Sequence, residues 1–327
     1  MSTEKRNSEA ESVETRAVKN AAIRVENLVK TFKDVRAVNG VSFAVEEGEL
    51  FAFLGENGAG KSTSIAVICG LIEKDGGKVY VAGRDTDGNA SANSEIGVVF
   101  QNSVLDKALS ARDNLCSRAA LYNIVGEEFQ RRLARLNDLL HFNEFIDRPL
   151  CRLSGGQKRK IDIARALIHQ PKILILDEPT TGLDPQTRRT VWEVVEKLQK
   201  EEKMTVFLTT HYMEEAAKAD YVVILDSGKV AAEGTPHMLK NRYTGDFIVL
   251  YGVSREAAIS ALGGEWGDKT ATFADGVKIR VDNTAQATKL IVSHPELFED
   301  YEVLKGNMDD VFLSVTGKTL KEGGGEQ

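Results

Sequence analysis

Residues 55–62 read Gly-Glu-Asn-Gly-Ala-Gly-Lys-Ser, and this stretch decides the fold. The five residues before it, Leu50–Leu54, are all apolar, as expected for a strand buried inside a sheet. The residues from Lys61 to Cys69 suit a helix, and the glycine that follows them is a residue that commonly ends helices. The sequence therefore predicts a buried strand, a glycine-rich turn and a helix in direct succession.

The chemistry of this turn points to phosphate. Glycines adopt backbone conformations closed to other residues and let the main chain approach a ligand closely. Successive N–H groups at a helix start, with the positive end of the helix dipole, form a cradle for anions. Lys61 adds a point charge, and the Ser62 hydroxyl suits Mg²⁺. We interpret the stretch as a phosphate-binding loop, since the alternative of a structural turn with a coincidental Lys-Ser does not account for its context.

Strand-like and helix-like segments alternate on both sides of the loop. Apolar runs are found at Ile23–Leu28, Val41–Val45, Ile96–Phe100, Ile173–Leu176, Val206–Thr209 and Tyr221–Leu225, and helical periodicity is found at Glu127–Leu140, Gly156–His169 and Thr187–Lys200. Strands apolar at nearly every position are typical of a parallel sheet buried on both faces. The pattern predicts an α/β doubly wound core with ligands at the carboxyl ends of its strands. The section between Gln101 and Leu153 has no strand pattern and is predicted to be a helical insertion, whose arginines form a solvated face.

Polar residues follow the predicted strands at the ligand-binding edge. Asp177 and Glu178 follow a buried strand, where a carboxylate suits a Mg²⁺ ligand and the next residue can polarise an attacking water. Gln101 ends another strand, and its amide oxygen can reach Mg²⁺ or that water. His211 ends a third strand and can donate a hydrogen bond to a γ-phosphate. Alone, the glutamine or the histidine would more often be structural, and their shared placement is what makes them candidates.

A second anion site is predicted where the segment Leu153-Ser154-Gly155-Gly156-Gln157 opens a helix. Ser154 is the expected N-cap, and the paired glycines expose backbone N–H groups. Lys158, Arg159 and Lys160 follow in the first turn, where positive charge opposes the helix dipole. We attribute this arrangement to an anion supplied from outside. Because the first loop already surrounds one nucleotide, a second phosphate-binding helix implies a second chain.

Together these residues resemble the nucleotide-binding subunit of the ABC transporter family. The corresponding motifs are the Walker A loop at 55–62, the Q-loop residue Gln101, the signature at 153–157, Walker B at 173–177 with Glu178, the D-loop at 182–184 and the switch residue His211. The likeness covers about Ala21 to Arg242. Phe32 corresponds to the aromatic residue that stacks on adenine, commonly a tyrosine. Glu56 replaces a common proline, and the resemblance gives its backbone N–H a role in phosphate binding.

The resemblance implies an ATPase with ATP and Mg²⁺ as cofactors. ATP would be bound by Phe32, Gly55, Glu56, Asn57, Gly58, Ala59, Gly60, Lys61, Ser62 and Thr63, and by Ser154, Gly155, Gly156 and Gln157 of a second copy. Ser62, Gln101 and Asp177 would hold the metal, and Glu178, His211 and Gln101 would act in hydrolysis. The implied assembly is a head-to-tail dimer, of identical chains or of paralogues, driving a separate transmembrane permease at the cytoplasmic face of the cell membrane.

The implied fold is a P-loop NTPase core with an N-terminal antiparallel β-subdomain and a helical subdomain. We expect a disordered tail at 1–20, the nucleotide-binding domain at 21–242 with its helical subdomain at about 102–165, and a small α+β domain at 243–320 with the order βαββαβ. The residues at 307–313 and 208–216 resemble those of exporters of drugs, antibiotics or lipid-linked glycans, which favours export over import.

Composition limits the alternatives. The 327 residues carry a net charge of −7, which argues against a nucleic-acid partner, and no apolar run is long enough for a membrane span or signal peptide. Three scattered cysteines without a CxxC pair indicate a reducing compartment. A non-transport ATPase acting on ribosomes, on DNA or in regulation remains the alternative. Such chains usually carry two nucleotide domains, zinc ligands or long coiled coils, and a module that only holds ATP would not need Glu178 and His211.

Overall fold

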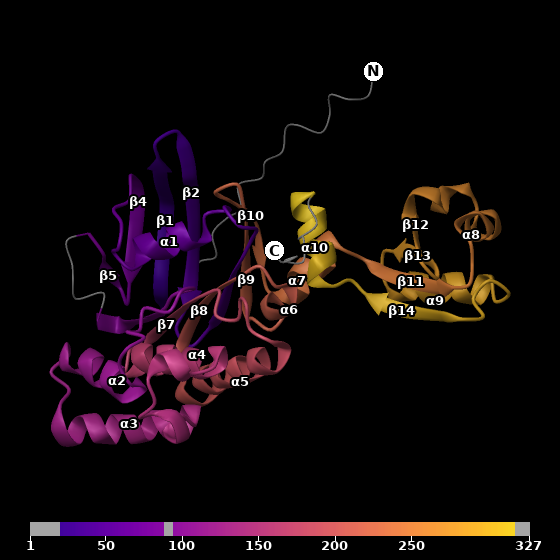
Figure 1. The fold of residues 1–327 in the computed structure, drawn as a ribbon. Coiled ribbons are helices and arrows are strands. Elements are labelled where there is room, and N and C mark those ends of the chain that lie inside the picture. Colours follow the sequence, from indigo (N-terminus) through magenta and orange to yellow (C-terminus); the bar gives the residue numbers. More distant parts are fainter. Residues whose placement is uncertain (1–19, 88–93, 318–327) are drawn as a thin grey trace. The chain divides into compact units, whose positions relative to one another are not determined.

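The structure is a computed structural model that describes residues 20–87 and 94–317 (Figure 1). The chain forms two compact units, of which the first ends at Glu233 and the second begins at Gly234. The sequence placed this boundary at 242, but the helix Pro236–Tyr243 (α7) packs on the C-terminal helix Met308–Thr316 (α10) and belongs to the second unit. The predicted disordered tail lies outside the described residues except for its last residue, as does the end of the predicted C-terminal domain.

A six-stranded sheet forms the centre of the first unit, in the order β10-β9-β3-β8-β7-β6. The strands are β3 (Leu50–Leu54), β6 (Ile96–Val99), β7 (Ile173–Asp177), β8 (Thr205–Thr210), β9 (Tyr221–Asp226) and β10 (Lys229–Gly234). The pairs from β9 through β3, β8 and β7 to β6 are parallel, and β3, β7 and β8 are buried at every position. The predicted doubly wound α/β core is therefore confirmed.

A second, four-stranded sheet covers part of the first and has the order β2-β1-β4-β5. Its strands are β1 (Ala21–Phe32), β2 (Val35–Glu46), β4 (Gly76–Val81) and β5 (Arg84–Asp85), and β1 pairs antiparallel with both β2 and β4. Phe43 of β2 packs on the rings of Phe51 and Phe53 of β3, with centroid distances of 5.4 and 5.0 Å. This aromatic contact joins the two sheets in one core.

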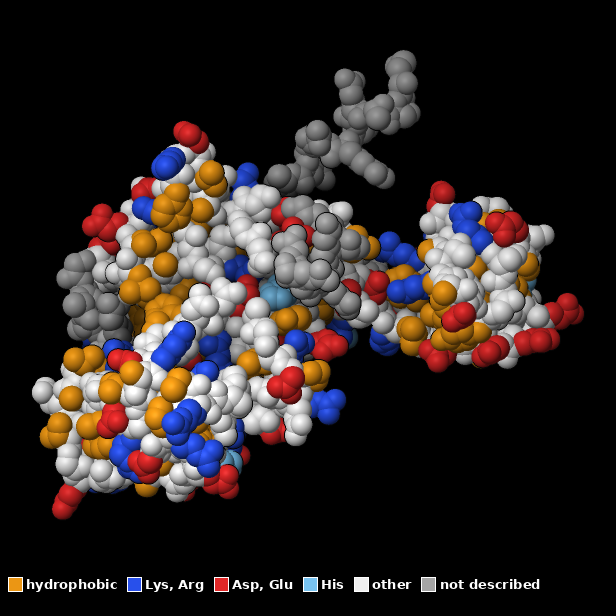
Figure 2. All heavy atoms as spheres, in the orientation of Figure 1, with side chains coloured by type: hydrophobic (Ala, Val, Ile, Leu, Met, Phe, Trp, Pro, Cys, Tyr) orange, Lys and Arg blue, Asp and Glu red, His pale blue; other side chains and the backbone are white. Residues whose placement is uncertain are grey.

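Helices flank the central sheet (Figure 1). They are α1 (Lys61–Ile68), α2 (Ala111–Ala120), α3 (Gly126–Leu140), α4 (Gly155–Leu167), α5 (Pro185–Glu202) and α6 (Met213–Ala216), with short 3-10 turns at Asn143–Phe145 and Leu150–Arg152. The section from 101 to 153 contains no strand, as predicted. The arginines of α3 form ion pairs with Glu128 and Glu202. Figure 2 shows acidic and basic side chains intermingled over this segment. Arg131 and Arg135 are exposed, as predicted, whereas Arg132 is partly buried and donates to the carbonyl oxygen of Ile168 at 2.9 Å.

The second unit has a four-stranded antiparallel sheet of the order β12-β13-β11-β14. Its remaining elements are β11 (Asp246–Tyr251), α8 (Arg255–Leu262), a 3-10 turn (Gly264–Lys269), β12 (Thr270–Phe273), β13 (Gly276–Val281), α9 (Thr284–Ser293) and β14 (Tyr301–Lys305). This is the predicted βαββαβ order followed by a helix. Its core includes Ile248, Leu250, Trp266 and Ile279. Among the helices of the described residues, none has the length and apolar character needed to cross a membrane.

Candidate functional site

The glycine-rich loop connects β3 to α1 and requires glycine at defined positions. Gly58 and Gly60 have φ angles of 84° and 102°, in the left-handed region that favours glycine. A Cβ atom on Gly60 would lie 2.5 Å from the carbonyl oxygen of Ala37, and one on Gly55 would lie 2.7 Å from that of Leu225. The tight turn therefore depends on the close approach of the loop to the backbone of β2 and β9.

Lys61 lies in the first turn of α1 and is only 4% exposed. Its ammonium group donates to the carbonyl oxygens of Gly55 and Glu56, at 2.6 and 3.0 Å, and lies 3.4 Å from Glu178 Oε1. Burial lowers the pKa of Lys61, and the negative charge of Glu178 opposes that shift. The positive charge is thus held inside the loop, at the start of the helix.

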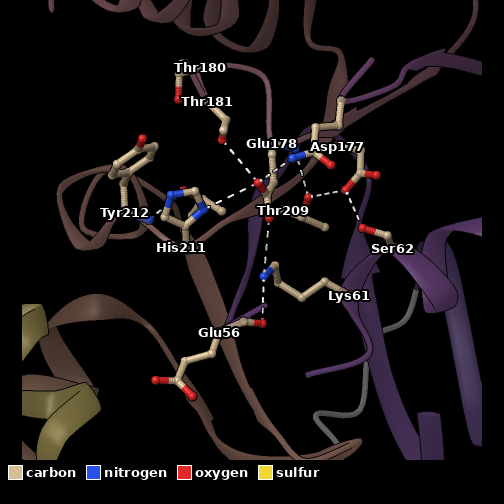
Figure 3. Close-up of polar contacts among 12 residues, drawn as sticks. Glu56, Lys61, Ser62, Asp177, Glu178, Thr180, Thr181, Thr209, His211 and Tyr212 are labelled. Atoms are coloured by element: carbon tan, nitrogen blue, oxygen red, sulfur yellow. Dashed lines mark hydrogen bonds and ion pairs between the residues drawn. The ribbon is translucent and has the colours of Figure 1, made fainter. Parts of the chain in front are cut away.

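The carboxylates at the end of β7 are tied to the loop and to the neighbouring strand (Figure 3). Ser62 Oγ donates to Asp177 Oδ1 at 3.2 Å, and Thr209 Oγ1 of β8 donates to the same oxygen at 2.7 Å. Thr209 Oγ1 also accepts the backbone N–H of Glu178 at 3.0 Å. Asp177 and Glu178 are both 7% exposed, so these bonds replace the water that the two acids have lost.

The carboxylate of Glu178 contacts several other side chains of the site. Its carboxylate lies 3.4 Å from His211 Nδ1 and accepts hydrogen bonds from Gln101 Nε2 at 3.2 Å and Thr181 Oγ1 at 3.1 Å (Figure 3). The interaction with His211 and the positive charge of Lys61 lower the pKa of Glu178 to about 2 against the opposing effect of burial. The carboxylate is therefore ionised at neutral pH, the state that a water-orienting base requires.

The structure thus brings together the residues that sequence reasoning placed at separate strand ends. Of these residues, Gln101 and Glu178 line a cleft of about 690 Å³, whereas Asp177 and His211 contact cleft residues from behind the lining. The full lining is Val35, Arg36, Ala37, Asn57, Gly58, Gly60, Lys61, Ser62, Thr63, Gln101, Glu178, Ser227 and Gly228. Phe32 is outside this lining: its ring is 47% exposed at the end of β1, with Lys30 Nζ 5.4 Å from its centroid. Val35, Arg36 and Ala37 of β2 form one wall of the cleft, and Lys61, Ser62 and Thr63 form part of the rest.

The signature segment starts α4 away from this cleft. Ser154 is the N-cap, as predicted: its Oγ accepts the N–H of Gln157 at 3.2 Å, and Gln157 Oε1 accepts the N–H of Ser154 at 3.0 Å. A Cβ atom on Gly156 would lie 2.6 Å from Thr187 Cγ2 in the first turn of α5. Ser154 and Gly155 are exposed, and none of residues 154–157 lines the cleft.

One prediction for the same helix is wrong. We attributed Lys158, Arg159 and Lys160 to an anion supplied from outside, but Arg159 is 6% exposed and binds inside the protein. Its guanidinium donates to backbone carbonyl oxygens beyond the ends of β6 and β7. Lys158 and Lys160 are half-buried. Arg159 is therefore explained by an internal contact and not by an external anion, while for Lys158 and Lys160 the attribution stays a prediction.

Several residues of the site were missed in the sequence, and all of them support other side chains. Thr209 and Thr181 bind the two acids, and the buried Glu215 accepts hydrogen bonds from Thr180, from Thr210 Oγ1 at 2.6 Å and from Trp192 Nε1 at 3.1 Å. Two adjacent threonines at the end of an otherwise apolar strand were a usable signal. Thr181 lies only three residues from Glu178, whereas the contacts of Thr180 and Trp192 with Glu215 join distant segments, so no local pattern contains those.

The site has a glycine-rich loop between the buried strand β3 and the helix α1, and this loop faces two carboxylates at the end of β7, a parallel strand of the same sheet. This arrangement defines a P-loop nucleoside triphosphatase. The family model described as "ABC transporter" matches residues 38–181. The linearmycin resistance ATP-binding protein of Bacillus subtilis (strain 168) is 35% identical over 315 residues, which are 92% of this chain and 100% of that protein. The chain belongs to the ATP-binding subunits of the ABC transporter family, which are ATPases.

Other comparisons agree. A Nod factor export ATP-binding protein of Sinorhizobium fredii is 34% identical over 96% of this chain and 92% of its own length. A daunorubicin resistance ATP-binding protein of Streptomyces coeruleorubidus is 34% identical over 90% and 95%. Among solved structures, a dimeric ATP-binding cassette in a post-hydrolysis state with ADP and Pi is similar, with a TM-score of 0.60 and 29% identity over 65% of this chain and 98% of that one.

Proposed function

We propose that this chain is the ATP-hydrolysing subunit of an exporter and that it drives a separate transmembrane permease from the cytoplasmic face of the membrane. The observation that carries the proposal is the convergence of Lys61, Gln101 and His211 on the carboxylate of Glu178. A regulatory module that only held ATP would have no use for an ionised carboxylate with its own hydrogen-bond donors. The direction of transport rests on the relatives, which are named for export and for antibiotic resistance.

Each part of the cleft has one role in ATP hydrolysis. The backbone of Gly55–Ser62 and Thr63 binds the phosphates, and Lys61 neutralises their charge. Glu178 orients the attacking water, and His211 binds the γ-phosphate. Phe32 stacks on adenine, because its exposed ring stands at the end of β1, near the start of β2 and Val35 of the cleft lining. These assignments apply to one half of each ATP site.

The cleft also suits Mg²⁺. Ser62 Oγ is 3.2 Å from Asp177 Oδ1, and the amide nitrogen of Gln101 donates to Glu178, which leaves the amide oxygen available as a ligand. A hydroxyl, a carboxylate and an amide oxygen form the all-oxygen donor set that Mg²⁺ prefers. When bound, the ion would neutralise charge on the β- and γ-phosphates. Thr209 holds Asp177 in place for this role through the bond to its Oδ1.

The other half of each site comes from a second copy or a paralogue. Residues 154–157 present a capped helix start with two glycines and stay outside the cleft of their own chain. A helix N-terminus is an anion site, and the similar solved cassettes include dimers. The segment therefore closes on ATP held by the loop of the partner. ATP binding shifts the population toward the closed dimer, and hydrolysis reopens it.

The experiment that tests the transport role is purification of the tagged chain from its own membranes. We expect a multi-span membrane protein to co-purify, and we expect loss of the chain to raise sensitivity to secreted antibiotics, as in the resistance relatives. Recovery with ribosomes instead would support the non-transport alternative, which no relative named above favours.

Ser154→Arg is expected to block turnover while ATP binding to the same chain's loop persists. The added side chain would meet the γ-phosphate region of the partner's ATP and prevent closure. Turnover and binding of a fluorescent ATP analogue are measured side by side. Ser110→Arg is the matched control, because Ser110 caps α2 in the same way and lies outside the cleft. Both changes remove a helix cap, worth about 1 kcal/mol. Equal turnover in the two variants would contradict the trans arrangement.

A further inference from the structure

The guanidinium of Arg159 binds inside the protein, unlike a charge that faces solvent or a partner chain. The residue lies in the first turn and a half of α4 and is 6% exposed. Its Nε donates to the carbonyl oxygen of Pro179 at 2.7 Å, its Nη1 to that of Phe100 at 2.7 Å, and its Nη2 to that of Glu178 at 3.2 Å. One rigid, planar guanidinium thus holds three backbone carbonyl groups from two separate segments.

These carbonyl groups belong to the backbone that carries the reacting side chains. Phe100 directly precedes Gln101, and Pro179 directly follows Glu178. Burial lowers the pKa of Arg159, while the negative charges of Asp162 and Asp177 oppose this. A buried guanidinium is stable only if its donors are used, and here backbone oxygens accept from its Nε, its Nη1 and its Nη2.

The conformation of Glu178 explains why its backbone has to be held. Its φ angle is 44°, in the left-handed region that is unfavourable for a residue with a side chain. Thr209 Oγ1 accepts the N–H of Glu178, and Arg159 donates to its C=O. The two bonds secure the peptide groups on both sides of a strained residue, which fixes the direction in which its carboxylate points.

We propose that Arg159 is a positioning residue, which holds the backbone of Glu178 and Gln101 in the geometry for hydrolysis and links it to α4. The inference rests on the proposed function, in which the start of the same helix binds ATP held by the partner. Arg159 thereby joins the signature segment of one ATP site to the base of the other through a single side chain.

Arg159 could also act only by attaching α4 to the sheet. Arg165 is the matched control for this purely structural role. That residue lies on the same helix, is partly buried, and donates from Nη2 to the carbonyl oxygen of Val98 in β6 at 2.7 Å. Burial also lowers the pKa of Arg165. Of its hydrogen bonds in the described residues, none goes to the segment from Asp177 to Pro179.

The first test compares Arg159→Lys with Arg165→Lys in the full-length chain. Lysine keeps the positive charge but cannot donate to three carbonyl groups in a plane. We expect kcat of Arg159→Lys to fall by about ten- to a hundredfold, as a misplaced reacting group does, with KM for ATP within about twofold of the original. Arg165→Lys should lose a comparable amount of thermal stability and keep its kcat. Equal kcat values for the two variants, measured below their unfolding temperatures, would overturn the proposal.

The second test uses mixed dimers made from two differently tagged copies. In the first mixed dimer, Arg159→Lys is on one chain and Glu178→Gln is on the other. The intact Glu178 is then on the chain that carries the Arg159→Lys change. In the other, both changes are on one chain, so the intact base has its own Arg159. We expect low turnover in the first mixed dimer and near half of the unmodified rate in the second. The reverse order would mean that Arg159 acts on the ATP held by the partner. That result would contradict the proposal that Arg159 positions Glu178 of its own chain.

The two tests separate this proposal from the proposed function. If the unmodified chain hydrolysed ATP as a monomer, the dimeric site would be wrong, while the kcat comparison would still measure whether Arg159 positions Glu178. If the dimer forms and Ser154→Arg blocks turnover but Arg159→Lys does not, the positioning role alone is refuted.

Discussion

Glu178→Gln is expected to lower the rate of ATP turnover by about two to four orders of magnitude, the range typical of losing a catalytic acid or base. The amide has nearly the same shape as the carboxylate but cannot accept a proton and has no negative charge. The interaction with His211 and the positive charge of Lys61 lower the pKa of this carboxyl group to about 2, so the side chain is ionised at neutral pH and its charge is part of the site. ATP should still bind, because Lys61 and the loop backbone are unchanged.

The closed dimer should therefore accumulate. Light scattering during size-exclusion chromatography with ATP and Mg²⁺ should show a mass near twice that of the chain, and the unmodified protein should lose this dimer as ATP is consumed. Glu214→Gln is the matched control, since Glu214 is an exposed acid close to His211 in sequence. If Glu178→Gln hydrolyses ATP at the normal rate, the choice of base is wrong.

Lys61→Ala should act at the earlier step and weaken ATP binding. A hydrogen bond between charged groups contributes about 1.5–3 kcal/mol, and its loss corresponds to a tenfold or more weaker affinity for ATP. Titration with a fluorescent nucleotide measures the affinity directly. A variant that retains full ATPase activity would refute the assignment of this loop.

Loss of folding has to be separated from loss of binding, because Lys61 and Glu178 form a buried pair. Removal of one partner leaves the other charge uncompensated, which is destabilising. Lys61→Ala combined with Glu178→Gln removes both charges, so it should recover thermal stability without recovering ATP affinity. Recovery of affinity in the double variant would mean that the single change acted through folding.

The sequence predicted the phosphate loop, the strand-end residues and the signature cap because each depends on local chemistry. Glycine at a positive φ, a carboxylate after a buried strand and a serine at a helix start are all constrained by neighbours in the chain. Their convergence followed from the geometry of parallel strands, whose carboxyl ends share one edge.

The errors have physical causes as well. The strands β4, β5 and β10 were missed because they contain few buried residues and so lack an apolar run. The reasoning about Arg159 considered only the helix dipole and neglected the helical period. Asp162, Ile163 and Ala166 lie on the same face as Arg159, and all are buried, so a periodicity of three to four residues would have pointed this side chain inward. In the Glu215 cluster, the contacts of Thr180 and Trp192 come from distant segments and leave no local signal.

The close contact between Gly156 and Thr187 limits how this corner of the protein can change. A methyl group at 156 would have to occupy space that Thr187 Cγ2 already fills, 2.6 Å away. The D-loop residue Asp184 caps α5 one turn earlier, where its Oδ1 accepts the N–H of Thr187 at 3.0 Å. The start of α4 and the first turn of α5 are therefore fitted to each other at these two residues, and any larger residue at 156 would need a smaller one at 187.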